Sequence, residues 1–481
     1  MLDNIISERE RKIKELKMVG IDPYPAQCRK TSSVGDVLNK FAKLAAAKKN
    51  FYLTGRIRSL RDQGKIIFLD IEDATGKIQA VLKKEETRDF SVFKKYLDIG
   101  DFLEIYGNPF QTQKGEKSIN VKKGKLLTKS VRPIPSDFYG LVDTETRLRK
   151  RYLDLALNKD LRELFIKKSE FWQAVREFLT RNGFLEVETP VFETTPGGAE
   201  AEPFVTHHNA LDRDFYLRIS LEIALKKLII GGFEKVCEIG RIFRNEGIDA
   251  EHLQDYTQME FYWAYADYND LQKFLEKMYK FVIKKTFGVL TLTWQGKKIN
   301  WGKKWPKVDY SKIFKEKNGF DPTTATEEKL KKRARELHLE LDKSLGKGRL
   351  IDLIYKKTVR PTLIQPCFLI NSPVETSPLA KRSFKNPKVV ERLQIIACGT
   401  ELGNGFSEAN DPQDQRERFE EQMKLRAAGD KEAQRLDEEF LEALGYGMPP
   451  TAGFGMSERL FSVLADKPIR ETIFFPPMKK K

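Results

Sequence analysis

The sequence contains few of the residues that form disulfides or bind transition metals. Among its 481 residues there are only four cysteines and four histidines. The cysteines lie far apart and form no CxxC pair, which is typical of a reducing compartment and argues against a disulfide framework. His207 and His208 are adjacent, but no other cysteine or histidine has the spacing that would complete a zinc site. We therefore expect neither disulfides nor structural zinc.

Long apolar runs and the common nucleotide-binding motifs are missing as well. No run of about 18 apolar residues occurs, so we expect no membrane span. The first twenty residues are charged and have a helical pattern, unlike a signal peptide. No Walker motif or GxGxxG follows a predicted strand, which argues against a P-loop or a Rossmann site. These absences predict a cytoplasmic protein without a membrane partner.

Basic residues, by contrast, are in excess, and the formal net charge is +16. Such a charge favours a polyanionic partner, because clustered lysine and arginine side chains attract the phosphates of nucleic acid. A protein that is basic without binding nucleic acid remains the alternative at this point.

The pattern of apolar residues divides the chain into four parts and predicts an α+β fold. Residues 1–50 form an N-terminal helical extension. Residues 51–131 contain about five short alternating strands, which favour a five-stranded β-barrel of the oligonucleotide-binding (OB-fold) kind. Residues 132–150 are a linker, and residues 151–481 mix antiparallel strands with flanking helices. A charged segment around 296–360 reads as a helical insertion.

The predicted barrel has basic and aromatic residues at its outward positions. The basic residues at these outward positions lie near Phe68 and Gln79, and they are Arg56, Arg58, Arg61, Lys65 and Lys77. Aromatic rings for base stacking, together with cations for phosphate, are what recognition of single-stranded RNA requires. The pattern alone leaves open whether Phe68 belongs to the barrel core or to such a surface.

One hairpin, residues 238–266, carries more charge than a buried sheet normally contains. Arg244 and Glu260 stand at the centre of its apolar strands, and an unpaired buried charge is energetically costly. Its pattern predicts two strands joined by the polar segment NEGIDAEHLQ. A chance cluster of charges on an exposed face is the alternative to a functional site.

The amino-acid sequence of this hairpin resembles a known motif. FRNEGIDAEHLQDYTQMEFYWAYADY resembles motif 2 of class II aminoacyl-tRNA synthetases, GFLEVETPVF resembles motif 1, and GFGMSERL resembles motif 3. PGGAEAEPFVTHHNALD, SPLAK and TELGNGFSEANDPQDQRERFEEQ are similar to the lysyl branch. The resemblance covers nearly the whole chain in the correct order. On these motifs the sequence resembles the bacterial-type lysyl-tRNA synthetases of class II, subclass IIb.

The resemblance implies an ATP- and Mg²⁺-dependent lysine–tRNA ligase that acts on tRNA-Lys as a homodimer, with motif 1 at the interface. It makes residues 51–131 an anticodon-binding domain and residues 151–481 a class II catalytic domain. The amino-acid carboxylate attacks the α-phosphate of ATP and is already an anion. The reaction therefore needs positioning and charge neutralisation rather than a general base.

The same resemblance assigns roles to individual residues. Arg244 and Arg459 are the expected catalytic arginines. The expected ATP-binding residues are Arg244, Glu246, His252, Tyr256, Glu401 and Arg459. The expected lysine-binding residues are Gly198, Glu222, Arg244, Glu260, Tyr262, Asn404, Phe406 and Glu408. Glu401 is the expected magnesium ligand, with Gln394 beside it, and the expected anticodon-reading residues are Arg61, Phe68, Gln79 and Glu116.

Three departures from the family pattern bear on catalysis. Gln394 stands where a second magnesium-binding glutamate is usual, SLEIALK (220–226) replaces the usual xPELYLK, and GFGMSERL is one residue shorter than the usual motif 3. The alternatives are a catalytically impaired RNA-binding protein or a lysyl-transferring synthetase paralogue. That paralogue family lacks the barrel, so residues 51–128 argue against it. Glu260 and Glu408 argue against an aspartyl or asparaginyl enzyme because they would repel an acidic side chain.

Overall fold

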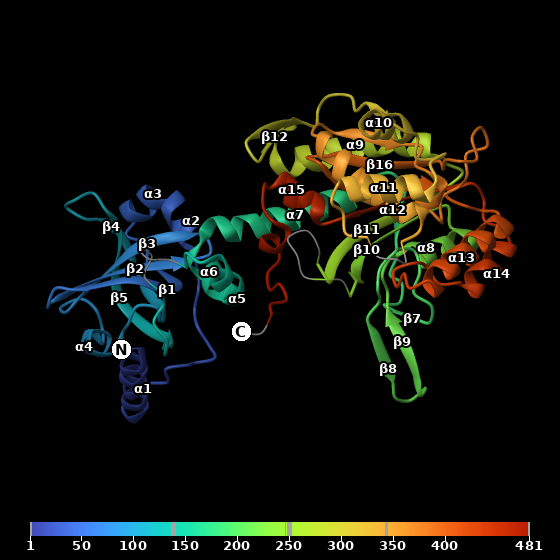
Figure 1. Cartoon of the computed structure of the whole chain (residues 1–481). Coiled ribbons are helices and arrows are strands. Elements are labelled where there is room, and N and C mark those ends of the chain that lie inside the picture. The colour runs from blue at the N-terminus through green and yellow to red at the C-terminus, as the bar shows by residue number, and fades with distance from the viewer. Residues whose placement is uncertain (1, 136–140, 246, 248–252, 342–344, 480–481) are drawn as a thin grey trace. The chain divides into compact units, whose positions relative to one another are not determined.

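The computed structural model describes residues 2–135, 141–245, 247, 253–341 and 345–479. The chain forms two compact units, residues 1–147 and residues 148–481 (Figure 1). The division falls within helix α5 (Thr144–Arg149). None of the helices in the described ranges is both long and apolar enough to cross a membrane.

The first unit is a closed β-barrel with helices around it. Its strands follow the order β1-β2-β3-β5-β4. Buried and half-buried residues alternate along β1, so that Leu53 and Ile57 point into the core. The elements are α1 (Leu2–Met18), α2 (Val34–Asn39), α3 (Phe41–Ala46), β1 (Phe51–Asp62), β2 (Ile66–Asp73), β3 (Gly76–Lys83), α4 (Phe90–Tyr96), β4 (Phe102–Gln111) and β5 (Lys117–Thr128). The predicted five-stranded barrel is confirmed.

The second unit is built on an eight-stranded sheet in the order β14-β15-β16-β17-β18-β11-β10-β6. Its first half contains α6 (Arg151–Leu157), α7 (Lys159–Arg181), β6 (Leu185–Glu186), β7 (Phe192–Glu193), β8 (Val205–His208), β9 (Arg213–Leu217), α8 (Glu222–Ile230), β10 (Lys235–Phe243), β11 (Asp255–Ala264), α9 (Tyr268–Phe287), β12 (Thr291–Trp294) and β13 (Lys297–Asn300). The charged hairpin predicted at 238–266 is the pair β10–β11, paired antiparallel.

The second half of this unit completes the sheet. It contains β14 (Lys307–Asp309), α10 (Tyr310–Asn318), α11 (Glu327–Glu336), α12 (Lys347–Thr358), η1 (Arg360–Thr362), β15 (Cys367–Ile370), η2 (Val374–Thr376), β16 (Arg392–Ala397), β17 (Thr400–Ser407), α13 (Pro412–Ala427), α14 (Glu438–Gly445), β18 (Thr451–Ser457), α15 (Arg459–Leu464) and η3 (Ile469–Thr472). Pro190 lies between the very short strands β6 and β7.

The segment around 296–360 differs from the predicted helical insertion in its first part. It begins with β13, which pairs with β12, and continues with β14, which pairs in parallel with β15 at the edge of the main sheet. Only from Tyr310 onward is it helical. Lysines flank both short strands, so their apolar alternation is too brief to detect in the sequence.

The two faces of the main sheet have different neighbours. On one face, Met259, Phe261 and Phe454 pack against α7 and α9 in the largest hydrophobic core. Because side chains alternate along a strand, Glu260 and Tyr262 point to the other face. That other face, which α8, α13 and α14 partly cover, contains the candidate site.

Candidate active site

A cavity of about 690 Å³ lies on this second face of the sheet. Neighbouring strands β17, β18 and β11 form its floor, and two rows of facing residues cross them. Asn404, Gly455 and Glu260 form one row, whereas Phe406, Gly453 and Tyr262 form the next. The middle position of each row is a glycine that lines the cavity.

The glycines of β18 are required by the space above them. A Cβ atom at Gly453 would collide with the Glu408 carboxylate and with the Tyr262 ring. Between the two glycines, Phe454 points to the opposite face and is buried in the core. The GFG sequence of the predicted motif 3 therefore makes room at Gly453 for the Glu408 carboxylate and the Tyr262 ring, while Phe454 anchors the strand in the core.

Most of the predicted substrate-binding residues meet in this cavity. The predicted residues that line the cavity are Gly198, Glu222, Arg244, Tyr256, Glu260, Tyr262, Glu401, Asn404, Phe406 and Arg459. Glu408 is buried directly beside Tyr262 and Gly453. Gln394 is buried beside Glu401. Glu246 and His252, which were predicted to bind ATP, lie outside the described residues.

Glu260 is held by hydrogen bonds from several directions. One carboxylate oxygen accepts from the Ser220 hydroxyl at 2.8 Å, from the Leu221 backbone N–H at 3.0 Å and from the Gln258 amide at 2.5 Å. The other accepts from the Tyr262 hydroxyl at 3.0 Å. A buried carboxylate with this many donors is fixed in place before any substrate arrives.

One end of the cavity contains a buried cluster of charged groups, which we call the acidic part. It comprises Glu222, Glu260, Glu408, Tyr262 and the neighbouring Lys226. The Lys226 ammonium donates to Glu222 Oε1 at 2.5 Å and forms an ion pair with Glu408. Burial raises the pKa of Glu222 to about 7, against the opposing effect of Lys226. Burial also raises the pKa of Glu408. Burial therefore opposes the ionisation of Glu222 and Glu408, and the Lys226 ammonium favours it.

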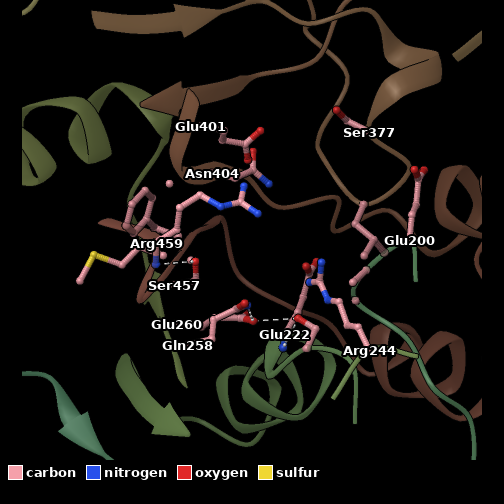
Figure 2. A pocket seen from close by; sticks show the side chains of 18 of the residues that line it. Glu200, Glu222, Arg244, Gln258, Glu260, Ser377, Glu401, Asn404, Ser457 and Arg459 are labelled. Atoms are coloured by element: carbon pink, nitrogen blue, oxygen red, sulfur yellow. Dashed lines mark hydrogen bonds between the residues drawn. The ribbon is translucent and has the colours of Figure 1, made fainter. Parts of the chain in front are cut away.

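The arginine part of the cavity is defined here as Arg244, Arg360, Arg392 and Arg459, all of which line it. Figure 2 shows the Arg244 and Arg459 side chains extending into the cavity from different elements. Arg244 donates to the Ile219 carbonyl at 3.2 Å, and its guanidinium carbon lies 5.7 Å from the centre of the Tyr256 ring. Several cations around one cavity match a ligand with several phosphates.

Glu401 and Gln394 form one unit, and their geometry bears on metal binding. The Gln394 amide nitrogen donates to Glu401 Oε2 at 2.5 Å. In the described part of the chain, no group of three or more His, Cys, Asp or Glu residues could hold a metal ion. Magnesium is commonly held by one or two carboxylates together with substrate phosphates, and Glu401 fits such a shared site.

Comparisons with known proteins identify the family. Residues 143–479 match the model of tRNA synthetases class II (D, K and N), and residues 51–127 match the OB-fold nucleic acid binding domain. The lysine–tRNA ligase of Moorella thermoacetica is 43% identical over 100% of this chain and 98% of its own length. Those of Carboxydothermus hydrogenoformans and Thermotoga maritima are each 42% identical over 100% of this chain and 99% and 97% of their own. The chain belongs to the lysyl-tRNA synthetase family of class II.

Membership of the lysyl-tRNA synthetase family confirms the predicted fold class. The eight-stranded sheet with its flanking helices is the class II synthetase domain, and the barrel is the OB-fold domain. The motif 2 hairpin is β10–β11, and motif 3 comprises β18 and the start of α15. Class II motifs 2 and 3 thus meet in one cavity although about 200 residues separate them.

The synthetase's OB-fold domain brings the predicted anticodon residues close together. Arg61 faces Phe68 across β1 and β2, and its guanidinium carbon lies 5.7 Å from the ring centre. Gln79 faces Asp70 on one neighbouring strand and Ser118 on the other. The side-chain oxygen of Gln79 accepts a hydrogen bond from the Ser118 hydroxyl at 3.0 Å. Because Ile67 and Leu69 are core residues, the intervening Phe68 points to the outside. Glu116 is exposed just before β5.

The sequence did not single out several residues of this synthetase cavity. These are Lys226 beside it and Gln258, Arg349, Lys356, Arg360, Ser377 and Arg392 in its lining. Arg392 donates to the Asn404 side-chain oxygen at 2.7 Å and to the Ser377 hydroxyl at 2.7 Å. Arg349 forms ion pairs with Glu200 at 3.1 Å and Glu432 at 2.9 Å. Lys226 had one detectable signal, its position four residues after Glu222 on a helix.

Proposed function

We propose that this protein activates L-lysine with ATP and transfers the lysyl group to tRNA-Lys. The observation that carries the proposal is a single cavity that combines a buried acidic part with several arginines. Lysine has two ammonium groups and one carboxylate, and ATP is a polyanion. The cavity therefore offers complementary charge to every ionised group of both substrates.

The positions of the residues support a division of labour. Glu222 and the Gly198 backbone would hold the α-ammonium group, because Gly198 has φ +82° and a Cβ there would contact both Glu222 and Ser220. Glu408 and Tyr262 would hold the side-chain ammonium, and Glu260 would fix Tyr262. Asn404 and Phe406 would bound the carboxylate side and the aliphatic stem.

Arg244 would bring the two substrates together. It would contact both the lysine carboxylate and the ATP α-phosphate, which neutralises charge as the carboxylate attacks. Tyr256 would stack on adenine, and Arg459 would bind the outer phosphates. Bound Mg²⁺ would neutralise phosphate charge, with Glu401 holding it and Gln394 orienting Glu401. In the activation step the nucleophile is the ionised lysine carboxylate, so that step needs no residue of this chain to remove a proton.

The exposed apolar residues near motif 1 support the proposed homodimer. Leu185, Phe192 and Val205 are 49%, 56% and 59% exposed, respectively. Exposed large apolar side chains are typical of an interface when several occur in one region of the surface. Sedimentation analysis of Phe192→Asp should show a shift toward monomer relative to the unmodified protein, and an unchanged monomer content would contradict this interface.

We also place the protein in the cytoplasm, in keeping with its free cysteines.

Pyrophosphate exchange tests the proposed activity. Labelled pyrophosphate should enter ATP only when lysine is present, and each of the other standard amino acids serves as a control. Absence of lysine-dependent exchange would refute lysine activation and would favour the catalytically impaired RNA-binding alternative. Transfer to tRNA-Lys transcripts then distinguishes this function from that of a lysyl-transferring paralogue, whose lack of a barrel already disfavours it.

A further inference from the structure

Lys226 occupies an unusual position for a lysine side chain. It lies on α8 one turn after Glu222, and its side chain is fully buried. The rings of Phe406 and Phe440 lie 5.5 and 5.7 Å from its ammonium nitrogen. Removing an ammonium group from water is strongly unfavourable unless close anions compensate. Glu222 and Glu408 are those anions.

The charges of the acidic part do not balance within the protein. Glu222, Glu260 and Glu408 supply three carboxylates, and Lys226 supplies one ammonium in direct contact with two of them. Arg392 also affects Glu222, but its own hydrogen bonds go to Asn404, Thr376 and Ser377. With every carboxylate ionised, the group is short of two positive charges. Lysine carries two ammonium groups, which is the missing number.

The Glu408 carboxylate can accept a further positively charged group. Its carboxylate is 1% exposed, and neither oxygen makes a hydrogen bond of good geometry to the described residues, although one lies at ion-pair distance from Lys226. Buried carboxylate oxygens normally accept hydrogen bonds. Lys226 therefore balances charge at Glu408 but leaves acceptor capacity that a substrate ammonium can use.

We propose that Lys226 is a positioning residue that sets the charge of the lysine pocket. By neutralising one of three carboxylates, it keeps Glu222 and Glu408 ionised and correctly placed, so that the pocket binds a substrate with two ammonium groups. This inference rests on the proposed lysine activation. It also assigns to α8 a specificity-determining role in the SLEIALK segment, which lacks the usual proline and aromatic residue near Glu222.

The sign of the expected pH dependence follows from the groups that face Lys226. Because burial raises the pKa of Glu222 to about 7, lysine binding in the unmodified protein should strengthen as the pH rises through 7. Lys226 lowers the pKa of both Glu222 and Glu408. Without its charge, both carboxyls should hold protons to higher pH, and lysine binding should require a more alkaline solution.

Steady-state pyrophosphate exchange with Lys226→Met tests the proposal across a range of pH. We expect the KM for lysine to rise at least about tenfold at pH 7, the KM for ATP to stay within about twofold, and the pH midpoint of lysine binding to move upward by about one unit. Lys226→Gln provides a second uncharged variant should the methionine variant fail to fold. Lys227→Met is the matched control, since the neighbouring Lys227 pairs with Glu439 on the protein surface.

The outcomes separate this inference from the proposed function. If the unmodified protein shows no lysine-dependent exchange, the proposed function fails. If the unmodified protein is active and both Lys226 variants lower only kcat or thermal stability, with an unchanged pH midpoint, Lys226 has a merely structural role and the inference is wrong. A larger KM for lysine with an alkaline shift in both variants supports it.

Discussion

The acidic and arginine parts of the cavity bind charge in different environments. Glu222, Glu260 and Glu408 are buried and contact Lys226, Ser220 and other internal groups, whereas Arg244 and Arg459 are only half-buried. Buried charges discriminate strongly, because a ligand that fails to pair with them leaves them desolvated and unsatisfied. Half-buried cations favour a flexible polyanion at a smaller desolvation cost. In the proposed function, the buried carboxylates would therefore select the amino acid, and the half-buried arginines would bind the phosphates of ATP.

The largest effect is expected from Arg244→Ala, which removes the residue proposed to contact both the lysine carboxylate and the α-phosphate of ATP. We expect lysine-dependent exchange to fall by about 10²- to 10³-fold, because a charge-stabilising donor at the reacting phosphate is lost. Arg241→Ala is the matched control, since this exposed arginine lies on β10 three residues before Arg244 and pairs with Asp255 at 2.5 Å. Similar losses in both variants would mean that Arg244 has no special role.

Glu408→Gln should weaken lysine binding in the acidic part of the cavity without affecting ATP binding in the arginine part. The expected result is a loss of about 10²-fold in kcat/KM for lysine with little change in the KM for ATP, because a charged hydrogen bond to a buried group is replaced by a neutral one. The measurement is exchange at varied lysine and at varied ATP. Equal weakening of both substrates would refute the assignment of Glu408 to the side-chain ammonium.

Phe68→Ala acts outside the cavity and should leave both of its parts unaffected. We expect the KM for tRNA-Lys in aminoacylation to rise by about tenfold, as expected for the loss of one base-stacking ring, with unchanged exchange. Phe110→Ala is the control on the same barrel, where Phe110 faces Lys83 rather than Arg61.

Binding of tRNA should also weaken as salt rises. A flat salt response would argue against the basic barrel face.

The smallest effect is expected from Gln394→Glu, which adds a negative charge beside Glu401. The Mg²⁺ concentration for half-maximal exchange should fall by roughly three- to fivefold, because a second carboxylate strengthens magnesium binding. Magnesium titration of the exchange reaction measures it. A rise in the required Mg²⁺ would show instead that the amide hydrogen bond to Glu401 matters more than the added charge.

The sequence predicted the strands of the barrel and hairpin well, because their side chains alternate clearly between core and solvent. Its motifs also led to Arg244, Glu260 and Tyr262, which do line the cavity. Lys226 was not predicted, since Glu408 is far away in the sequence and only the fold brings the two into contact. Strands β13 and β14 were missed for a different reason, since tertiary pairing rather than local pattern stabilises them.

The two glycines of β18 have a consequence for the entropy of binding. Gly453 makes room for Glu408 and Tyr262, and a substrate placed over Gly455 rests on peptide backbone that the sheet already holds rigid. No side chain at these positions has to give up rotational freedom when the substrate arrives, a loss that long side chains pay on being fixed. These two positions of the cavity floor therefore contribute no loss of side-chain freedom when a substrate binds.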